Sequence, residues 1–423
     1  MTTSPSSTAS PPYHTLAMVA IGIGALLLLA SVCAALAFVL VPTMSSDQAL
    51  VTNTSVLSLG AVTLGYGTLL LFIGLALRQG KLTAPIRLPS PILFIVLFVV
   101  VLIIGQIILA RNIATAYSFP FFHVLASLLV PLTVLAYASP RLGPASLRSM
   151  LAQFTWGGLV TIALALVFEL LIGSVLFVLA VLAFAFALGT ERLTALVEQL
   201  RFSTSDPQRI IQVLSQDPFA ILIAAVTAIL LFVVIVPLLE ELIKATGPAL
   251  LISRRSRAHA TVTKSEALLW GLAAGAGYAF TENMFNAQGT LTDLTSPTSF
   301  WAVIMLLRAG TSLMHITATA TVSIGWYHAL VNKNKSRLVL LLAAATLAHA
   351  IWNSTALLAF GASAVNNANG NSALLSTLFV SIVWSCLALL FILFLIWLRR
   401  LIRWAQPPVE IIPSNVTSLE IKG

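Results

Sequence analysis

Residues 219–244 read FAILIAAVTAILLFVVIVPLLEELIK. The part from Phe219 to Val236 contains no charged residue, and as a helix it is long enough to cross roughly 30 Å of hydrocarbon. Because polar and apolar residues do not alternate along it, the run predicts a transmembrane helix and not a barrel strand. Its last turn carries Glu240, Glu241 and Lys244. Ionisable side chains in a span cost free energy and usually pair or do chemistry, so this stretch predicts a membrane protein with a polar site.

Apolar runs of this kind recur along the whole chain of 423 residues. Hydrophobic residues make up 59% of the sequence and charged residues 8%, whereas a soluble domain carries about a quarter charged residues. The sequence therefore predicts an all-α protein, a polytopic bundle of about ten transmembrane helices. The predicted spans are Ala17–Val41, Val56–Leu77, Ile92–Ala110, Phe119–Ala138, Phe154–Ala187, Phe219–Ile243, Ala267–Asn286, Phe300–Leu330, Leu338–Phe360 and Leu374–Leu398. The run of residues 150–189 fits either one tilted helix or a helix with a re-entrant segment.

The formal net charge of +9 has its basic residues in short loops between the apolar runs. These residues are Arg78, Lys81, Arg87, Arg254, Arg255, Arg257, Lys264, Lys333, Lys335, Arg337, Arg399, Arg400 and Arg403. Basic loops of this kind face the cytoplasm, so we predict an integral protein of the cell (plasma) membrane with both termini cytoplasmic. No basic patch is interleaved with aromatic residues, which argues against nucleic acid as a partner. The only cysteines, Cys33 and Cys386, lie inside apolar runs and predict no disulfide framework.

The two halves of the chain differ in the ionisable residues that their spans contain. Before Asp217 the spans hold few of them, and one of these, Glu169, has no partner at helical spacing. After Asp217 nearly every span holds one or more. We therefore predict an accessory transmembrane bundle at residues 17–217 and a catalytic transmembrane bundle at residues 218–403. A disordered N-terminal tail at residues 1–16 and a cytoplasmic C-terminal tail at residues 404–423 flank them.

The first polar group, Glu240-Glu241-Leu-Ile-Lys244, follows a proline. Pro237 removes a backbone hydrogen bond to Val233, so a kink is expected just before the acidic pair. Lys244 lies four and three residues after the two glutamates and can reach either carboxylate. One ammonium group cannot neutralise two carboxylates, and the remaining acid suits activation of a water molecule as a general base. The structural alternative is an interfacial charge cluster at the end of a span.

Two further polar groups lie on the next two spans. Gly271, Gly275 and Glu282 share one helix face, and small residues at this spacing let two helices approach closely. Glu282 should therefore face a neighbouring helix, although a packing face with a structural glutamate is the alternative. The following span carries a polar stripe, which indicates the lining of a cavity and consists of Arg308, Ser312, His315 and Thr319.

The last polar group is His349-Ala-Ile-Trp-Asn353. His349 and Asn353 are four residues apart and face the same way on a helix, so together they can donate two hydrogen bonds to one oxygen, as an oxyanion hole requires. Taken alone, each of the four groups has a structural explanation. Their occurrence in four successive spans favours one shared site.

In this order the four groups resemble the signature segments of PrsW-type intramembrane proteases, which belong to a wider group with the CAAX prenyl endopeptidases. The segments are EExxK at Glu240–Lys244, the glycine-rich helix that ends in Glu282-Asn283, the helix of Arg308 and His315, and HAIWN at His349–Asn353. The resemblance covers roughly residues 219–355 and implies an endopeptidase that cuts a peptide bond in or beside the bilayer. It implies that Glu240 activates water and that Glu241 and Lys244 hold the Glu240 side chain in position. It also implies that His349 and Asn353 stabilise the oxyanion.

The resemblance also implies a metalloprotease, with Glu282 as a second base or a metal ligand and with Asn283, Arg308 and His315 in support. Two histidines and one glutamate suit a Zn²⁺ site with an open position, so the candidate metal ligands are Glu282, His315 and His349. A water molecule activated by glutamate without metal fits these residues equally well. The substrate implied by the resemblance is a protein with a single membrane span, such as an anti-sigma factor.

Two other functions remain open on the sequence alone. Intramembrane Glu, Arg and His also mark ion paths. Pro237 and Gly247-Pro248 can break a helix at a binding site, as in a proton-coupled transporter or channel. The third hypothesis is a scaffold that keeps the fold, lacks activity and binds other membrane proteins.

Overall fold

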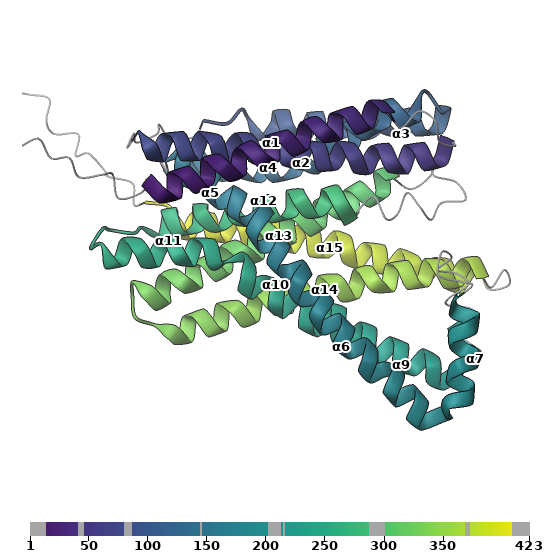
Figure 1. The fold of residues 1–423 in the computed structure, drawn as a ribbon. Helices are drawn as coiled ribbons and strands as arrows, with labels where there is room; N and C mark the ends of the chain where they lie inside the picture. The colour runs from purple at the N-terminus through teal and green to yellow at the C-terminus, as the bar shows by residue number, and fades with distance from the viewer. Residues whose placement is uncertain are drawn as a thin grey trace, which may run out of the picture.

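The computed structural model describes residues 14–40, 46–79, 87–143, 146–201, 213–214, 216–286, 301–368 and 373–407, and this part of the chain is helical and contains no strand (Figure 1). The predicted tails, residues 1–16 and 404–423, lie mostly outside it. The helices are α1 (His14–Leu40), α2 (Ser46–Arg78), α3 (Pro91–Arg111), α4 (Thr115–Leu142), α5 (Leu147–Thr155), η2 (Trp156–Thr161), α6 (Ile162–Leu188), α7 (Thr190–Arg201), α9 (Pro218–Ile229), η3 (Leu230–Ile235), α10 (Val236–Lys244), α11 (Thr246–Arg257), α12 (Lys264–Asn286), α13 (Trp301–Leu330), α14 (Lys335–Ala368) and α15 (Ala373–Ala405). The predicted all-α polytopic bundle is confirmed.

Within the described residues, nine helices are long and apolar enough to cross a membrane. They correspond to the predicted spans except for Ala267–Asn286, which forms α12. Helix α12 lies inside the bundle, and most of its side chains between Ala267 and Met284 are fully buried. A helix that is surrounded by other helices needs no lipid-facing surface, which explains how α12 can be rich in glycine and carry polar residues.

The close contact between α12 and α13 positions one side of the site. A Cβ atom at Gly275 would lie 2.7 Å from the Cα of Ile316, and one at Gly271 would lie 2.7 Å from the Cα of Ala320. The prediction that this glycine face packs against a neighbouring helix is therefore confirmed. Glu282 follows on the same face and is directed at α13, where it contacts Arg308.

Residues 147–188 form one continuous helix, so the run that the sequence left open is a single long element. The π-helical turn η2 joins α5 to α6. The outer half of α6 projects away from the bundle with α9 beside it, and α7 turns back at its outer end (Figure 1). We call α6, α7 and α9 the arm.

The expected kink before the acidic pair takes the form of the π-helical turn η3. The N–H of Val236 donates to the carbonyl of Leu231, one residue further back than in an α-helix, and Pro237 has no N–H to donate. The carbonyl of Phe232 thus has no donor within its own helix. The side-chain amide of Asn353 on α14 donates to it at 3.1 Å, which ties this helix to α14.

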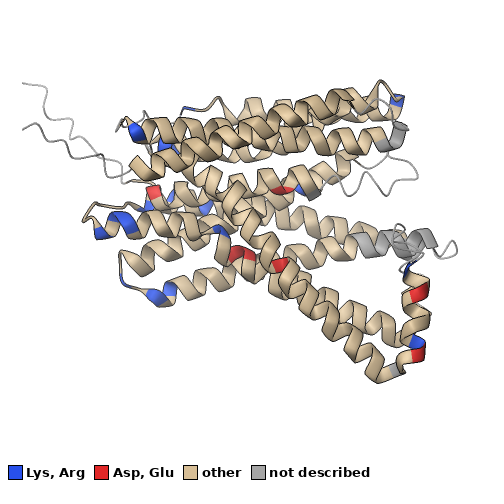
Figure 2. Cartoon of the chain, in the orientation of Figure 1, with Lys and Arg blue, Asp and Glu red and all other residues tan. Residues whose placement is uncertain are grey.

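Lysine and arginine residues gather mainly at the end of the bundle where α11 lies (Figure 2). The start of α12 and the end of α15 meet at this end, where the Ser265 hydroxyl donates to the Ala405 carbonyl. Helix α1 also begins there (Figure 1). One end of the bundle therefore carries most of the basic residues and both ends of the described chain, as the loop charges predict. That this end is cytoplasmic stays a prediction.

Candidate active site

The four polar groups of the sequence meet where α10, α12, α13 and α14 pack together. The side chains of Glu241 and Lys244 are fully buried, whereas 8% of the Glu240 side chain and 14% of the Glu282 side chain are exposed. Of the acidic pair, only Glu240 exposes any part of its side chain.

The ammonium group of Lys244 lies at the centre of the site. Its Nζ atom is 2.5 Å from Glu240 Oε2, 3.0 Å from Glu241 Oε1 and 2.6 Å from His315 Nδ1. It is also 4.1 Å from the centre of the Tyr278 ring, which is within the range of a cation–π interaction. One positive charge thus holds both carboxylates of α10 and contacts side chains of α12 and α13.

His315 connects this ammonium group to a second set of charges. Its Nε2 atom lies 2.6 Å from Glu282 Oε2, and Arg308 Nη2 lies 3.0 Å from Glu282 Oε1. The Nε of Arg308 also donates to Asn283 Oδ1 at 2.8 Å. A carboxylate only accepts and an ammonium group only donates. His315 therefore carries its hydrogen on Nε2 and presents a lone pair at Nδ1.

His349 enters the site from α14. Its Nδ1 atom lies 3.0 Å from Glu241 Oε1, and its ring centre lies 4.9 Å from that of His315 at an interplanar angle of 86°. Because Glu241 accepts the hydrogen of Nδ1, the Nε2 atom of His349 keeps a lone pair. Asn353 donates instead to the carbonyl of Phe232. The two residues of the predicted oxyanion pair thus have different partners.

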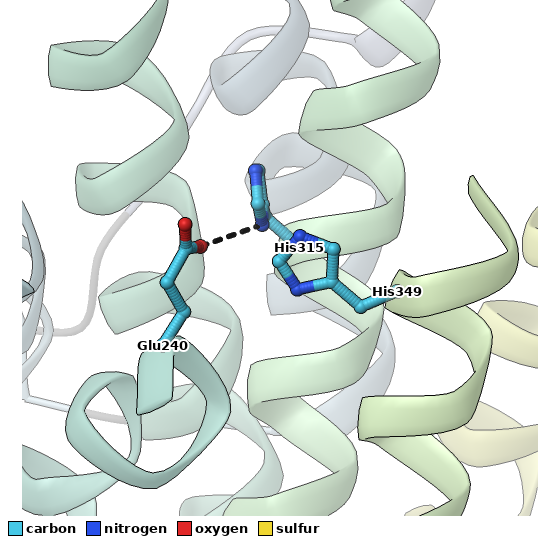
Figure 3. A group of neighbouring side chains, drawn as sticks. All are labelled: Glu240, His315 and His349. Carbon is cyan, nitrogen blue, oxygen red and sulfur yellow. Dashed lines mark ion pairs between the residues drawn. The ribbon is translucent and has the colours of Figure 1, made fainter. Parts of the chain in front are cut away.

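Glu240, His315 and His349 form a group that can hold a metal ion. One ligand atom from each lies within 4.8 Å of the others, and all three residues are buried. Figure 3 shows the three side chains pointing toward one another from three helices, and its dashed line joins Glu240 Oε2 and His315 Nδ1, which are 3.9 Å apart. Two histidines and one glutamate are a donor set that zinc uses in catalytic sites.

This group differs in one member from the predicted ligands Glu282, His315 and His349. Glu282 binds the opposite nitrogen of His315, and Glu241 binds the opposite nitrogen of His349. Carboxylates in these positions orient metal-binding imidazoles and leave the other nitrogen free to bind. The residues present therefore fit a metal ion held by Glu240 and the two rings. Because the Lys244 ammonium group already contacts Glu240 and His315, metal binding requires this side chain to withdraw.

Glu169 of α6 also lies near the site, although it has no partner at helical spacing along the sequence. Its helix contacts α10 and α12, and its side chain lies in the electrostatic field of Glu240, Glu282 and Lys244. One feature of the sequence could have identified it. Glu169 is the only acidic residue of residues 147–188, and a carboxylate in an apolar span is costly unless it has a polar environment.

A model of the PrsW family intramembrane metalloproteases matches residues 178–388, about half of the chain. The matched range begins within α6 and ends within α15, so it contains every site residue described above except Glu169. No curated protein and no solved structure matches the chain.

Proposed function

Because the chain belongs to the PrsW family of intramembrane metalloproteases, we propose that it hydrolyses a peptide bond of a membrane protein at the site built around Glu240. The proposed substrate is a protein with a single membrane span, such as an anti-sigma factor. The observation that carries this proposal is the convergence of Glu240, His315 and His349 from three helices into one buried group. Such a concentration of ionisable groups inside a membrane bundle is costly and is expected where chemistry takes place.

We assign the activation of water to Glu240. Its side chain is 8% exposed, whereas that of Glu241 is fully buried, so Glu240 is the member of the pair that lies nearer the surface and the better candidate for contact with a water molecule. A general base must lie within hydrogen-bonding reach of the proton that it removes. As long as no metal ion is bound, the Lys244 ammonium group, 2.5 Å from Glu240 Oε2, holds this carboxylate in place.

The remaining residues orient the reacting groups. Glu241 fixes the His349 ring through Nδ1, and Glu282 fixes the His315 ring through Nε2. Both rings thereby present a lone pair, which suits a metal ligand, whereas donation to an oxyanion would require a second ring hydrogen. For Asn353 we propose a positioning role, because its amide supports the turn that precedes Glu240.

A divalent metal ion such as Zn²⁺, when held by Glu240, His315 and His349, supplies Lewis-acid polarisation of water and of the scissile carbonyl. The protein contributes the buried donor set and the carboxylates that orient both rings. Hydrolysis consumes water, and we propose that it enters past Glu282 and Arg308, which each expose 14% of their side chains.

The test is cleavage of a panel of single-span substrates by the purified full-length protein in liposomes. We expect Glu240→Gln together with Glu241→Gln to lower cleavage by about 10²- to 10⁴-fold, the usual contribution of a general base. The matched control is Glu266→Gln, which removes a carboxylate of α12 that pairs with Arg255 far from the site. Undiminished cleavage by the double variant would overturn the assignment of Glu240.

A further inference from the structure

Helix α11 leads from the site to the basic end of the bundle. Its first residue, Thr246, is separated from Lys244, the last residue of α10, by Ala245 alone. The helix runs along the bundle (Figure 1) to the end where lysine and arginine residues gather (Figure 2). Its last turn reads Ser253-Arg-Arg-Ser-Arg257. This basic turn is therefore joined to the site by a single helix.

The arginines of this turn lie on two different faces of α11. Arg255 is turned toward the bundle, where it pairs with Glu266 at the start of α12 and lies 5.1 Å from the centre of the Trp270 ring. Arg254 and Arg257 are three residues apart and share another face, and both are exposed. Leu250, one turn before Arg254 on that face, is 57% exposed. The outer face of α11 thus carries an apolar side chain followed by two cations.

The order of these side chains matches the layers of a bilayer. A helix rises about 1.5 Å per residue, so Arg254 and Arg257 lie about 6 Å and about 10 Å beyond Leu250 along the helix axis. The headgroup layer on each side of the hydrocarbon core is about 5–8 Å thick. With Leu250 among the acyl chains, both arginines reach the depth of the headgroups.

The charge at this end of the bundle selects the kind of headgroup. Among the described residues there, Glu266 is the only acidic one, and Arg255 pairs with it (Figure 2). The other basic side chains create a positive field that this single carboxylate cannot balance. Guanidinium groups bind phosphate oxygens through two parallel hydrogen bonds. An anionic headgroup offers such a phosphate together with a net negative charge, which a zwitterionic headgroup lacks.

We propose that Arg254 and Arg257 form a binding surface for anionic phospholipid headgroups at the end of α11. The partner is the leaflet of the bilayer at the basic end of the bundle. Clusters of basic residues at the end of a membrane span bind anionic lipids in this way. The inference does not depend on the hydrolysis proposed above, and its test needs no substrate.

The test is thermal unfolding of the purified full-length protein in detergent, titrated with phosphatidylglycerol or with phosphatidylcholine that carries the same acyl chains. A ligand that binds only the folded protein raises its melting temperature. We expect phosphatidylglycerol to act at lower concentrations than phosphatidylcholine, and added salt to weaken the effect, because salt screens exposed charges. Inorganic phosphate at the same concentrations should have no such effect, which separates a lipid headgroup from a free anion.

Two substitutions measure what the arginines contribute. Arg254→Gln and Arg257→Gln should each increase the phosphatidylglycerol concentration that gives half of the maximal rise in melting temperature by about 5-fold, the usual contribution of a basic residue near an anionic surface. The double variant should show an increase of about 25-fold. The matched control is Arg111→Gln, which removes an exposed arginine at the end of α3, opposite the basic end (Figure 1). It should respond to both lipids like wild type.

Four results would overturn the inference. The arginines bind no lipid if the double variant responds to phosphatidylglycerol like wild type. An equal response of wild type to the two phospholipids would remove the preference for anionic headgroups. A melting temperature that falls equally in both lipids in the double variant would mean that the arginines only stabilise the carboxyl end of α11, where positive charges favour the helix dipole. An equal rise with inorganic phosphate would indicate a site for a free anion and not a membrane surface.

Discussion

Helices α1–α4 and the site helices α10, α12, α13 and α14 both bury polar side chains, but they satisfy them differently. In the first region the partners are mostly backbone carbonyls, as where Thr54 donates to Leu50 at 2.7 Å and Asn53 donates to Ala116 at 2.8 Å. In the second region charged side chains bind one another in a continuous network. A bond to a carbonyl satisfies a polar group with little cost, whereas buried charges carry a large desolvation penalty.

This difference indicates which substitutions should affect stability and which should affect cleavage. A side chain that binds a backbone carbonyl supports the fold, and its loss should lower the free energy of unfolding alone. A side chain in the charged network also determines where the reacting groups lie. Its loss should lower cleavage per folded molecule out of proportion to any change in stability.

The largest effect is expected for Lys244→Met. It leaves two buried carboxylates without their counter-charge, and breaking a buried ion pair in this way costs about 3–5 kcal/mol of stability. It also frees Glu240 and His315 from the contacts at 2.5 and 2.6 Å. We therefore expect loss of cleavage and a melting temperature that is low with a chelator and rises when Zn²⁺ is added.

The measurement is thermal unfolding in detergent, with wild type as the control. Wild type should respond less to Zn²⁺, because Lys244 already neutralises the carboxylates. A variant whose melting temperature is independent of Zn²⁺ would contradict a metal site at Glu240, His315 and His349. This readout does not depend on knowing the substrate.

Two glycines offer a matched comparison of the two regions. A Cβ atom at Gly275 would lie 2.7 Å from the Cα of Ile316, and one at Gly24 would lie 2.9 Å from the carbonyl oxygen of Gly67. Overpacking by Gly275→Ala or Gly24→Ala should cost about 1–3 kcal/mol in each case. Only Gly275→Ala should also lower cleavage per folded molecule, because it pushes the helix of Glu282 away from α13. Equal loss of cleavage in both variants would show that the regions are not separable in this way.

Much of the fold could be predicted from the sequence, because the apolar runs are long and uninterrupted. The glycine spacing of α12 indicated which face of this helix packs against a neighbour. The apolar runs of the sequence could not show that α12 lies inside the bundle. The π-helical turn at Trp156–Thr161 has no sequence signal as clear as a proline. For that reason the length of the helix through residues 147–188 stayed open.

The site was predictable to the extent that helical spacing determines it. Lys244 reaches both glutamates because it lies within one turn of them, and that contact follows from the sequence. The partners between helices depend on how the helices are rotated and packed, which one sequence does not specify. The same limit explains why Glu240 and not Glu282 joins the two histidines, and why the packing of α6, which carries Glu169, against α10 was not predicted.

A smaller effect is expected for Asn353→Ala in α14. The substitution removes the donor to the Phe232 carbonyl at 3.1 Å, and no other donor of that helix can replace it, because Pro237 lacks an N–H. We expect a loss of about 1–3 kcal/mol, the cost of a carbonyl left without a hydrogen-bond partner in an apolar span, and a modest fall in kcat as α10 shifts. Asn353→Asp, which cannot donate when ionised, should resemble alanine. Loss of all cleavage at unchanged stability would instead favour a direct role for Asn353 at the oxyanion.

The smallest effect is expected for Thr54→Val in the first region. Valine keeps the shape of threonine and removes only the hydroxyl that donates to Leu50 within the same helix. Hydrogen bonds of side chains within membrane bundles contribute about 0.6 kcal/mol on average, so the melting temperature should change little and cleavage should not change. Kinetic assay and thermal unfolding of the same preparation measure both quantities. A fall in kcat at wild-type stability would mean that α2 is coupled to the charged network, since the Tyr66 hydroxyl of α2 contacts Thr281 on α12 at 2.8 Å and offers the route for such coupling.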